Sequence, residues 1–240
     1  MEKRIENEIQ HGKFLSKICA GEIWNWEGVA GRRRWERRTR MLTTHINSKM
    51  QVLEIGCGTG YFTSELQKTN AQISAIDISP DLLEIAKKRI NHKNVIFMLE
   101  NGYEQSFPSE CFDTIVGSSV LHHLDVDRAL KEFYRVLKKT GSIYFTEPNM
   151  LNPQIALQKN IPWLKKRLGD SPDEIAFFRW NLKNKLEKYG FNKIEIIPFD
   201  FLHPNIPATF IQLVTSLGKI LEKVPLIKEI AGSLYIKAFK

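Results

Sequence analysis

From residue 51 to residue 145, short apolar runs alternate with segments in which apolar residues recur every three or four positions. The short runs predict β-strands, and the recurring pattern predicts amphipathic helices. The predicted strands are QVLEI, AQISAIDI, VIFMLE, FDTIVGSS and SIYFTEP, and helices are expected to start in YFTSELQK, at Ser79 and at Asp127. Strands that alternate with helices through short connections predict a parallel, doubly wound α/β sheet.

Two of the predicted helices carry boundary signals. Ser79, Pro80 and Asp81 are residue types that favour a helix N-terminus, because Ser caps the free amides, Pro lacks one and Asp meets the positive end of the dipole. The helix expected from Asp127 is predicted to end before Gly141.

The chain after Glu147 is less regular. Four prolines lie within residues 148–172, a helix is predicted near 177–189, and KIEIIPFDF and SLYIKAF are predicted as strands. The segment 209–224 places seven apolar side chains on one helix face: Phe210, Leu213, Val214, Leu217, Ile220, Leu221 and Val224. We expect this face to pack against the domain, with contact to a membrane surface as the alternative.

The glycine loop LEIGCGTG follows the first predicted strand. It has the pattern G-x-G-x-G at Gly56, Gly58 and Gly60, whereas the NAD fingerprint G-x-G-x-x-G would need a glycine at position 61 or 63. Glu54 precedes the loop, and its carboxylate would repel a pyrophosphate. A ligand with an ammonium and a sulfonium, such as S-adenosylmethionine (SAM), suits the loop better. Gly60 is expected to serve helix packing.

Several segments together resemble the class I SAM-dependent methyltransferases, and within them the type 11 small-molecule group. VLEIGCGTG, AIDIS, NGYEQSFPSECFDTIVGSSVLHHL and RVLKKTGSIYFTEP match in fixed order over about 100 residues. The resemblance implies a Rossmann-like seven-stranded methyltransferase sheet, with the last strand antiparallel and helices on both faces. It also implies that SAM binds at the carboxyl ends of the strands.

The resemblance also assigns cofactor-binding roles to individual residues. Glu54, Gly56, Cys57 and Gly58 match the positions around the methionine part of SAM. Asp77 matches the acid that binds the ribose hydroxyls, and Ile78 its apolar neighbour against adenine. Asn101 and Gly102 match the pair at the adenine edge, where the family more often has Asp than Asn. Ser118 matches the start of the fourth motif, whose backbone passes the cofactor.

Residues 31–40, GRRRWERRTR, contain six arginines with tryptophans nearby. A nucleic-acid surface would use such arginines for phosphates and Trp24, Trp26 and Trp35 for stacking. We favour a solvated helix face with Trp35, Leu42 and Ile46 packed inward. One arginine would then bind the SAM carboxylate. The candidates are Arg33, Arg34 and Arg38, and Arg34 is the one included in the predicted cofactor site.

Methyl transfer needs a base only when the acceptor must lose a proton. His123 and His203 are the candidate catalytic residues, and His122 is a weaker one, because the LHHL segment recurs among members with many substrates. Cys57 is interpreted as a small space-filling residue rather than a nucleophile. No metal-ligand pattern is present in the sequence.

Composition limits the remaining alternatives. With 42% hydrophobic residues, three scattered cysteines, no apolar run of membrane-spanning length and no signal-peptide core, residues 1–240 are predicted to form a single cytoplasmic domain. The net charge of +8 permits an anionic partner without identifying one. Residues 1–50 are expected to form a helical N-terminal extension. Residues 148–172 and 198–224 are expected to form acceptor-pocket or lid insertions together with the start of the chain.

The sequence thus predicts a methyltransferase that acts on a small, apolar or amphiphilic acceptor. Trp24, Trp26, Trp163, Phe199, Phe201 and Phe210 in the variable segments suggest this acceptor class. RNA methylation is the runner-up; GSSVLHH, however, differs from the N/D-P-P-Y motif of enzymes that methylate base amines. A SAM-binding regulatory protein without catalysis is a third alternative. No specific nucleic acid is expected as a partner.

Overall fold

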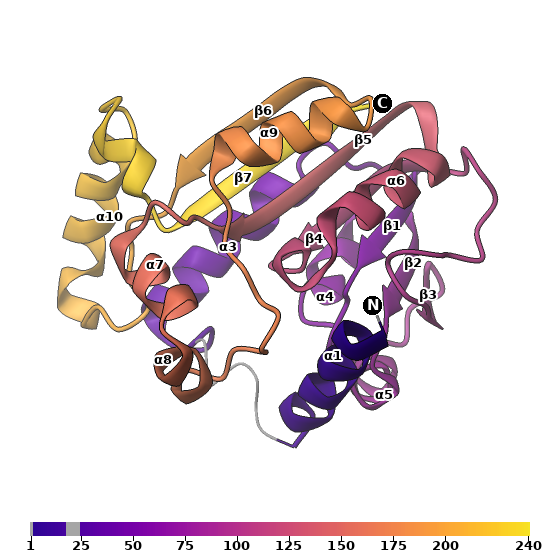
Figure 1. Ribbon diagram of the computed structural model, residues 1–240, viewed down its shortest axis with the longest axis horizontal. Coiled ribbons are helices and arrows are strands. Elements are labelled where there is room, and N and C mark those ends of the chain that lie inside the picture. Colours follow the sequence, from indigo (N-terminus) through magenta and orange to yellow (C-terminus); the bar gives the residue numbers. More distant parts are fainter. Residues whose placement is uncertain (1, 18–24) are drawn as a thin grey trace.

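The computed structural model describes residues 2–17 and 25–240, so Cys19 and Trp24 lie outside the described residues. Seven strands form one sheet in the order β3-β2-β1-β4-β5-β7-β6 (Figure 1). They are β1 (Gln51–Ile55), β2 (Gln72–Asp77), β3 (Val95–Leu99), β4 (Phe112–Ser118), β5 (Leu137–Pro148), β6 (Asn192–Phe199) and β7 (Ser233–Phe239). β7 runs antiparallel to both of its neighbours, β5 and β6, and all other pairs of neighbouring strands are parallel. The predicted seven-stranded sheet with an antiparallel last strand is confirmed.

The helices cover both faces of the sheet. They are α1 (Glu2–Leu15), α3 (Val29–Thr43), α4 (Thr63–Leu66), α5 (Pro80–Arg89), α6 (Val126–Val136), α7 (Pro153–Asn160), α8 (Pro162–Arg167), α9 (Arg179–Lys188) and α10 (Ile211–Leu221). Single turns of 3₁₀-helix are η1 (Gln67–Thr69), η2 (Leu121–His123), η3 (Ala208–Phe210) and η4 (Ile227–Ile230). None of the helices within residues 2–17 and 25–240 is long and apolar enough to cross a membrane.

Two large hydrophobic clusters form most of the core, one on each face of the sheet. Side chains alternate along a strand, so neighbouring residues of β1, Val52 and Leu53, enter different clusters. The cluster that contains Leu53 packs against α6 and α9, with Phe133 fully buried at its centre. The other packs against α3, α4 and α5, with Leu42 of α3 fully buried. Trp35 and Ile46 also pack against this second cluster, as predicted for the inward face of the arginine-rich helix.

The predicted start of α5 is confirmed, whereas the predicted start and end of α6 are wrong. Ser79 caps α5, because its hydroxyl accepts the amide of Leu82, and Pro80 is the first helical residue. The cap of α6 is Asp125, not Asp127, since the carboxylate of Asp125 accepts the amide of Arg128. Gly141 does not end this helix either; it lies inside β5, whose first residue, Leu137, directly follows the last residue of α6.

The apolar face of α10 is not buried against the domain, contrary to expectation. Phe210, Leu213, Leu217, Ile220 and Val224 are all exposed. The helix instead packs through a narrower side formed by Ile211 and Gly218. The segment 148–172, in which the prolines suggested irregular structure, contains the short helices α7 and α8, each with a proline at its first position.

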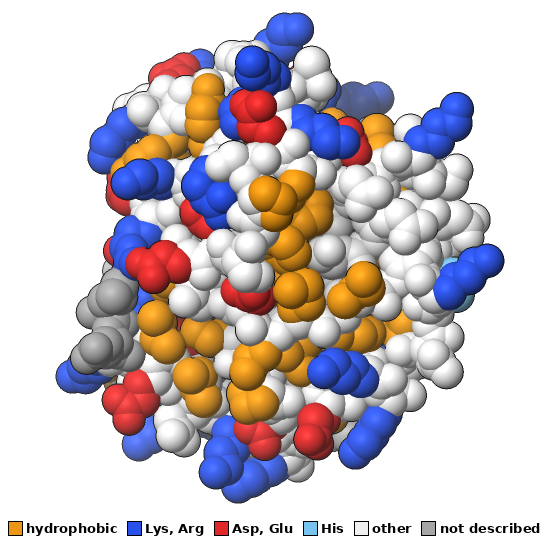
Figure 2. All heavy atoms as spheres, turned by 90° about the vertical axis from the view of Figure 1, so that its right-hand side faces the viewer, with side chains coloured by type: hydrophobic (Ala, Val, Ile, Leu, Met, Phe, Trp, Pro, Cys, Tyr) orange, Lys and Arg blue, Asp and Glu red, His pale blue; other side chains and the backbone are white. Residues whose placement is uncertain are grey.

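The opposite end of the sheet also exposes apolar side chains. Strand β3 is an edge strand, and its Ile96 and Leu99 are exposed. Figure 2 shows the side of the molecule on which β3 lies in Figure 1, with hydrophobic side chains gathered in its middle and charged ones around them.

Candidate cofactor and acceptor site

A cavity of about 940 Å³ opens at the carboxyl ends of β1, β2 and β4. The glycine loop after β1, Asp77 at the end of β2 and the turn after β4 form one part of its wall. Residues of α1, of α3 and the loop before it, of the segment 148–170 and of the loop 200–205 form most of the rest. In doubly wound sheets ligands bind where the strand order reverses, which here is between β1 and β4.

The glycine loop is built around backbone angles that favour glycine. Gly56 and Gly58 have φ angles of +64° and +53°. A Cβ at Gly56 would lie 2.4 Å from Cγ2 of Val120, whereas a Cβ at Gly58 would meet nothing within 4 Å. Because Gly58 lines the cavity, the free volume beside its backbone is available to a ligand. At Gly60 a Cβ would lie 3.2 Å from the backbone of Ala86, which confirms that this glycine serves packing against α5.

Asp77 joins the glycine loop to the second strand. Its Oδ2 accepts the amide of Gly58 at 2.7 Å, and its Oδ1 accepts the amide of Ser79 at 2.8 Å. These bonds fix the carboxylate at the cavity wall, and each oxygen keeps a second lone pair for a ligand hydroxyl. Burial raises the pKa of Asp77, although both amides favour the ionised form. The arrangement suits recognition of two neighbouring hydroxyl groups.

Two buried charged groups near the cavity have unused hydrogen-bonding capacity. Oε2 of Glu54 and Nε of Arg38 have no hydrogen-bond partner among the described residues. Burial raises the pKa of Glu54 to about 8 and lowers that of Arg38 to about 10. Glu54 lies behind the glycine loop and does not itself line the cavity, whereas Arg38 does. A ligand with one ammonium and one carboxylate would match this pair, which is the charge pattern of the methionine part of SAM.

The structure separates the three candidate arginines. Arg33 is exposed, does not line the cavity and lies 3.5 Å from Oε1 of Gln212. Arg34 lines the cavity, but its Nε is paired with Asp200 at 2.9 Å. Arg38 is buried, hydrogen bonds to Ser119 and Ser233 through its terminal nitrogens and also pairs with Asp200 at 3.5 Å, whereas its Nε has no partner among the described residues. Arg38 is therefore the better placed of the three for a carboxylate ligand.

The other predicted cofactor residues lie at or next to the cavity. Cys57, Ile78, Gly102 and Ser118 line it. Asn101 does not: its Oδ1 accepts the amides of Tyr103 and Glu104 at 2.8 and 2.9 Å and so stabilises a turn. Burial raises the pKa of Cys57 well above its usual range, which keeps the thiol protonated and agrees with a space-filling role.

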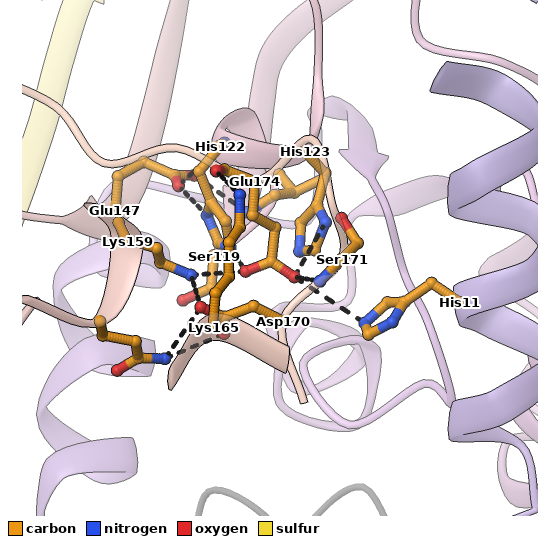
Figure 3. A network of polar contacts seen from close by, with 12 residues as sticks. His11, Ser119, His122, His123, Glu147, Lys159, Lys165, Asp170, Ser171 and Glu174 are labelled. Atoms are coloured by element: carbon orange, nitrogen blue, oxygen red, sulfur yellow. Dashed lines mark hydrogen bonds and ion pairs between the residues drawn. The ribbon is translucent and has the colours of Figure 1, made fainter. Parts of the chain in front are cut away.

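A buried network of polar side chains forms the cavity wall beside the turn after β4 (Figure 3). Glu147, at the carboxyl end of β5, accepts the amides of Val120 and Leu121 at 3.0 and 2.8 Å. It also hydrogen bonds to Nδ1 of His122 at 2.6 Å. A single buried carboxylate thus fixes the turn that carries both histidines, in which Ser119 has a φ of +57°.

The two histidines have different environments. Burial and the charge of His123 lower the pKa of His122 despite its bond to Glu147. Burial also opposes a charged His123, but the hydrogen bond to Glu8 and the charge of Glu174 outweigh it and raise the pKa of His123. Glu8 comes from α1; its Oε2 lies 2.9 Å from Nδ1 of His123, and its Oε1 accepts the hydroxyl of Ser171. His123 is therefore the more basic of the pair.

The same network contains the one group within residues 2–17 and 25–240 that could ligate a metal ion. Ligand atoms of His122, His123 and Glu174 lie within 4.8 Å of one another. The ammonium of Lys159 pairs with Glu174 at 2.5 Å and with Asp170 at 2.8 Å. Because a divalent ion would face this ammonium, the cluster fits a charge-balanced protein network better than a metal centre.

His203 and the predicted aromatic residues are only partly brought together. His203 lines the cavity, and its Nε2 lies 3.1 Å from Nε2 of Gln154. Burial and the nearby charge of Arg34 lower its pKa. Trp26 and Phe201 line the cavity, whereas Trp163 and Phe210 are exposed and Phe199 is in the core.

The sequence did not predict the charged partners at the centre of the polar network, which include Glu8, Glu147, Lys159, Asp170 and Glu174. Glu147 had a usable signal, because it is an acid at the end of a predicted strand, as Asp77 is. The other four lie in segments rich in charged residues, where no spacing distinguishes them from solvated positions.

Comparison with known proteins identifies the domain. A family model described as Methyltransferase domain matches residues 53–145. Malonyl-(acyl-carrier protein) O-methyltransferase of Priestia megaterium is 32% identical over 110 residues, which cover 45% of this chain and 40% of that protein. Demethylmenaquinone methyltransferase of Tropheryma whipplei is 33% identical over 159 residues, which cover 63% of this chain and 66% of that protein.

A solved structure extends the likeness to the whole fold. A SAM-dependent methyltransferase of Thermotoga maritima, described as a possible histamine N-methyltransferase, superposes with a TM-score of 0.70 at 19% identity. The match covers 96% of this chain and 99% of that one. The fold is that of the Rossmann-like methyltransferases. Residues 53–145 carry a methyltransferase domain of the type 11 group, and S-adenosyl-L-methionine is the cofactor of this domain.

Proposed function

We propose that this protein transfers the methyl group of SAM by in-line displacement to a small amphiphilic acceptor. The observation that carries the proposal is the continuity of the cavity. One cavity is lined by most of the predicted SAM residues of the matched domain, and further parts of its wall come from α1, α3, residues 148–170 and the loop 200–205, all outside residues 53–145. A cofactor and a second molecule can therefore meet in one space.

Within this cavity we assign the cofactor to the side of the glycine loop. The free volume at Gly58, the two unused lone pairs of Asp77 and the free Nε of Arg38 correspond to the methionine, ribose and carboxylate parts of SAM. The ionised form of Glu54 would supply negative charge behind the loop for the ammonium. When bound, SAM supplies an already activated methyl group, so the protein has mainly to align the acceptor and exclude water.

We assign the role of proton acceptor to His123. It lines the cavity, and Glu8 orients it through the bond to Nδ1, which leaves Nε2 for an acceptor O–H or N–H. Because Glu8 belongs to α1, the N-terminal helix contributes directly to the base. His203 lines the same cavity, and its lowered pKa keeps it neutral; we assign it to acceptor binding rather than proton transfer.

The lining of the acceptor side supports an amphiphilic molecule. Apolar side chains from three segments, such as Ile5, Ile155 and Phe201, contribute to it, whereas Glu8 and His123 contribute polar groups. A molecule with a polar reactive group and an apolar body satisfies both kinds of wall. The demethylmenaquinone methyltransferase relative is consistent with this acceptor class.

The arginine run gives little support to the RNA alternative. Arg34, Arg37 and Arg38 make intramolecular ion pairs with Asp200 or Glu222, at 2.6 to 3.5 Å. These pairs tie α3 to the segment 200–222, so three of the six arginines are not free for phosphates.

The test is product identification with methyl-labelled SAM. The protein is incubated with labelled SAM and either an organic-solvent extract of lipids, a pool of polar metabolites or total RNA. Label in the lipid or metabolite fraction, lost in His123→Asn, supports the proposal. Label confined to RNA would establish the runner-up, and SAM binding without turnover in any fraction would favour a non-catalytic protein.

A further inference from the structure

The apolar face of α10 forms a continuous exposed stripe. Its exposed side chains are spaced by three and four residues, so they lie on one face of the helix. η4 extends the stripe through Leu226, which is 85% exposed, and Ile227 and Ile230. We call this set the α10–η4 stripe: Phe210, Leu213, Leu217, Ile220, Val224, Leu226, Ile227 and Ile230. Contiguous apolar surface of this kind marks an interaction site in a folded protein.

The orientation of α10 is fixed by contacts on its other side. Gly218 packs closely against the loop after β6: a Cβ there would lie 3.3 Å from Cβ of Phe201. Glu222, just after the helix, pairs with Arg37 of α3 at 2.6 Å. Figure 1 shows α10 at one end of the molecule, at the periphery of the fold. The stripe therefore faces outward in the folded protein, and these contacts prevent the helix from rotating to bury it.

The charged residues of the same segment indicate which kind of partner the stripe binds. The two acids of residues 208–230, Glu222 and Glu229, are both neutralised by arginines, at 2.6 and 2.7 Å. Lys219, Lys223 and Lys228 have no acidic partner within residues 2–17 and 25–240. The segment that carries the apolar stripe thus also carries uncompensated positive charge. A second copy of the chain would bring three more lysines towards these, whereas an anionic lipid surface would complement them.

We propose that the α10–η4 stripe binds the protein peripherally to the surface of an anionic phospholipid membrane. The stripe enters the boundary between headgroups and acyl chains, and the lysines contact lipid phosphates. The loop 200–205, which lines the cavity, leads directly into η3 and α10. An amphiphilic acceptor could thus reach the cavity from the membrane; this last step rests on the proposed function, whereas membrane binding does not.

The proposal is tested by vesicle sedimentation of the full chain without SAM or acceptor. The probes are vesicles of phosphatidylcholine alone and of an equal mixture of phosphatidylcholine and phosphatidylglycerol. We expect binding to the anionic vesicles that weakens as salt is added. The double variant Leu217→Ser/Ile220→Ser should bind at least tenfold more weakly, and Lys219→Gln/Lys223→Gln should lose the preference for anionic lipid.

The matched control is Ile96→Ser/Leu99→Ser on β3, at the other end of the sheet, where both side chains are similarly exposed. This variant should bind vesicles as the wild type does, and thermal melting checks that all variants are folded. Three results would overturn the proposal: no binding to anionic vesicles, equal loss in the control, or a dimer in sedimentation velocity that the stripe substitutions dissociate. Because no methyl transfer is measured, failure of the proposed function would leave these outcomes unaffected.

Discussion

Glu54 provides the sharpest test of the cofactor site, because the structure predicts opposite effects on stability and on binding. Its carboxyl group is buried without a partner for Oε2, and burial raises its pKa from 4.5 to about 8. At pH 7 the unfolded chain carries an ionised Glu54, whereas the folded protein must take up a proton. Folding stability therefore falls as the pH rises from 4.5 to 8.

The size of the effect follows from the pKa difference. Each pH unit between the two pKa values costs about 1.4 kcal/mol, so Glu54 destabilises the cofactor-free protein by about 3 kcal/mol at pH 7. Glu54→Gln removes this cost and keeps the shape of the side chain. For a chain of this size the variant should melt about 6 to 10 °C higher at pH 7, and the difference should vanish near pH 4.5.

Cofactor binding should change in the other direction. If the ionised Glu54 attracts the SAM ammonium, wild-type affinity should increase between about pH 6 and pH 8, with proton uptake by the buffer, and Gln should weaken SAM binding by about tenfold or more. The assays are thermal melting across pH and calorimetry in two buffers of different ionisation enthalpy.

Asp113 on β4 is the matched control. Its pKa is lowered, with Lys138 as the stabilising partner, so Asp113→Asn should lower the melting temperature instead of raising it. A Glu54→Gln protein that melts at or below the wild-type temperature at pH 7 would refute the reasoning, as would SAM affinity that does not depend on Glu54.

Four further outcomes are expected. Asp77→Ala should weaken SAM binding about ten- to a hundredfold and lower thermal stability, since it leaves two backbone amides unpaired; Asp77→Asn should do less harm, and calorimetry with melting curves checks both. Arg38→Lys should weaken SAM binding while Arg33→Lys has no effect, as measured by the same titrations. Glu8→Gln should lower the pKa of His123 and shift the acidic limb of the rate profile to lower pH, which initial rates across pH will show. NAD should not compete with SAM, and a chelator should leave the rate unchanged; competition by NAD or a rate restored by added metal would contradict the site assignment.

Much of the fold followed from local pattern. The β-strands, the Ser79 cap and the glycine loop depend on residues close together in sequence, and the fixed order of motifs implied the sheet that the structure shows. The wrong predictions arose where the local sequence pattern allowed more than one outcome. Asp125 and Asp127 are equally good caps by type, and only the path of the backbone makes Asp125 the capping residue. An apolar helix face predicts burial. In the structure, however, α10 packs against Phe201 through the side that carries Gly218, and this contact leaves the α10–η4 stripe exposed.

The site divides in the same way. The sequence predicted the glycine-loop part of the cofactor site as one compact motif, because a loop between a strand and a helix brings its own residues together. The partners of His123 were decided only by tertiary structure, since Glu8 and Glu174 lie 115 and 51 positions away in opposite directions along the chain. A buried ion pair has no sequence periodicity, and its members resemble solvated charges until the fold removes the water around them.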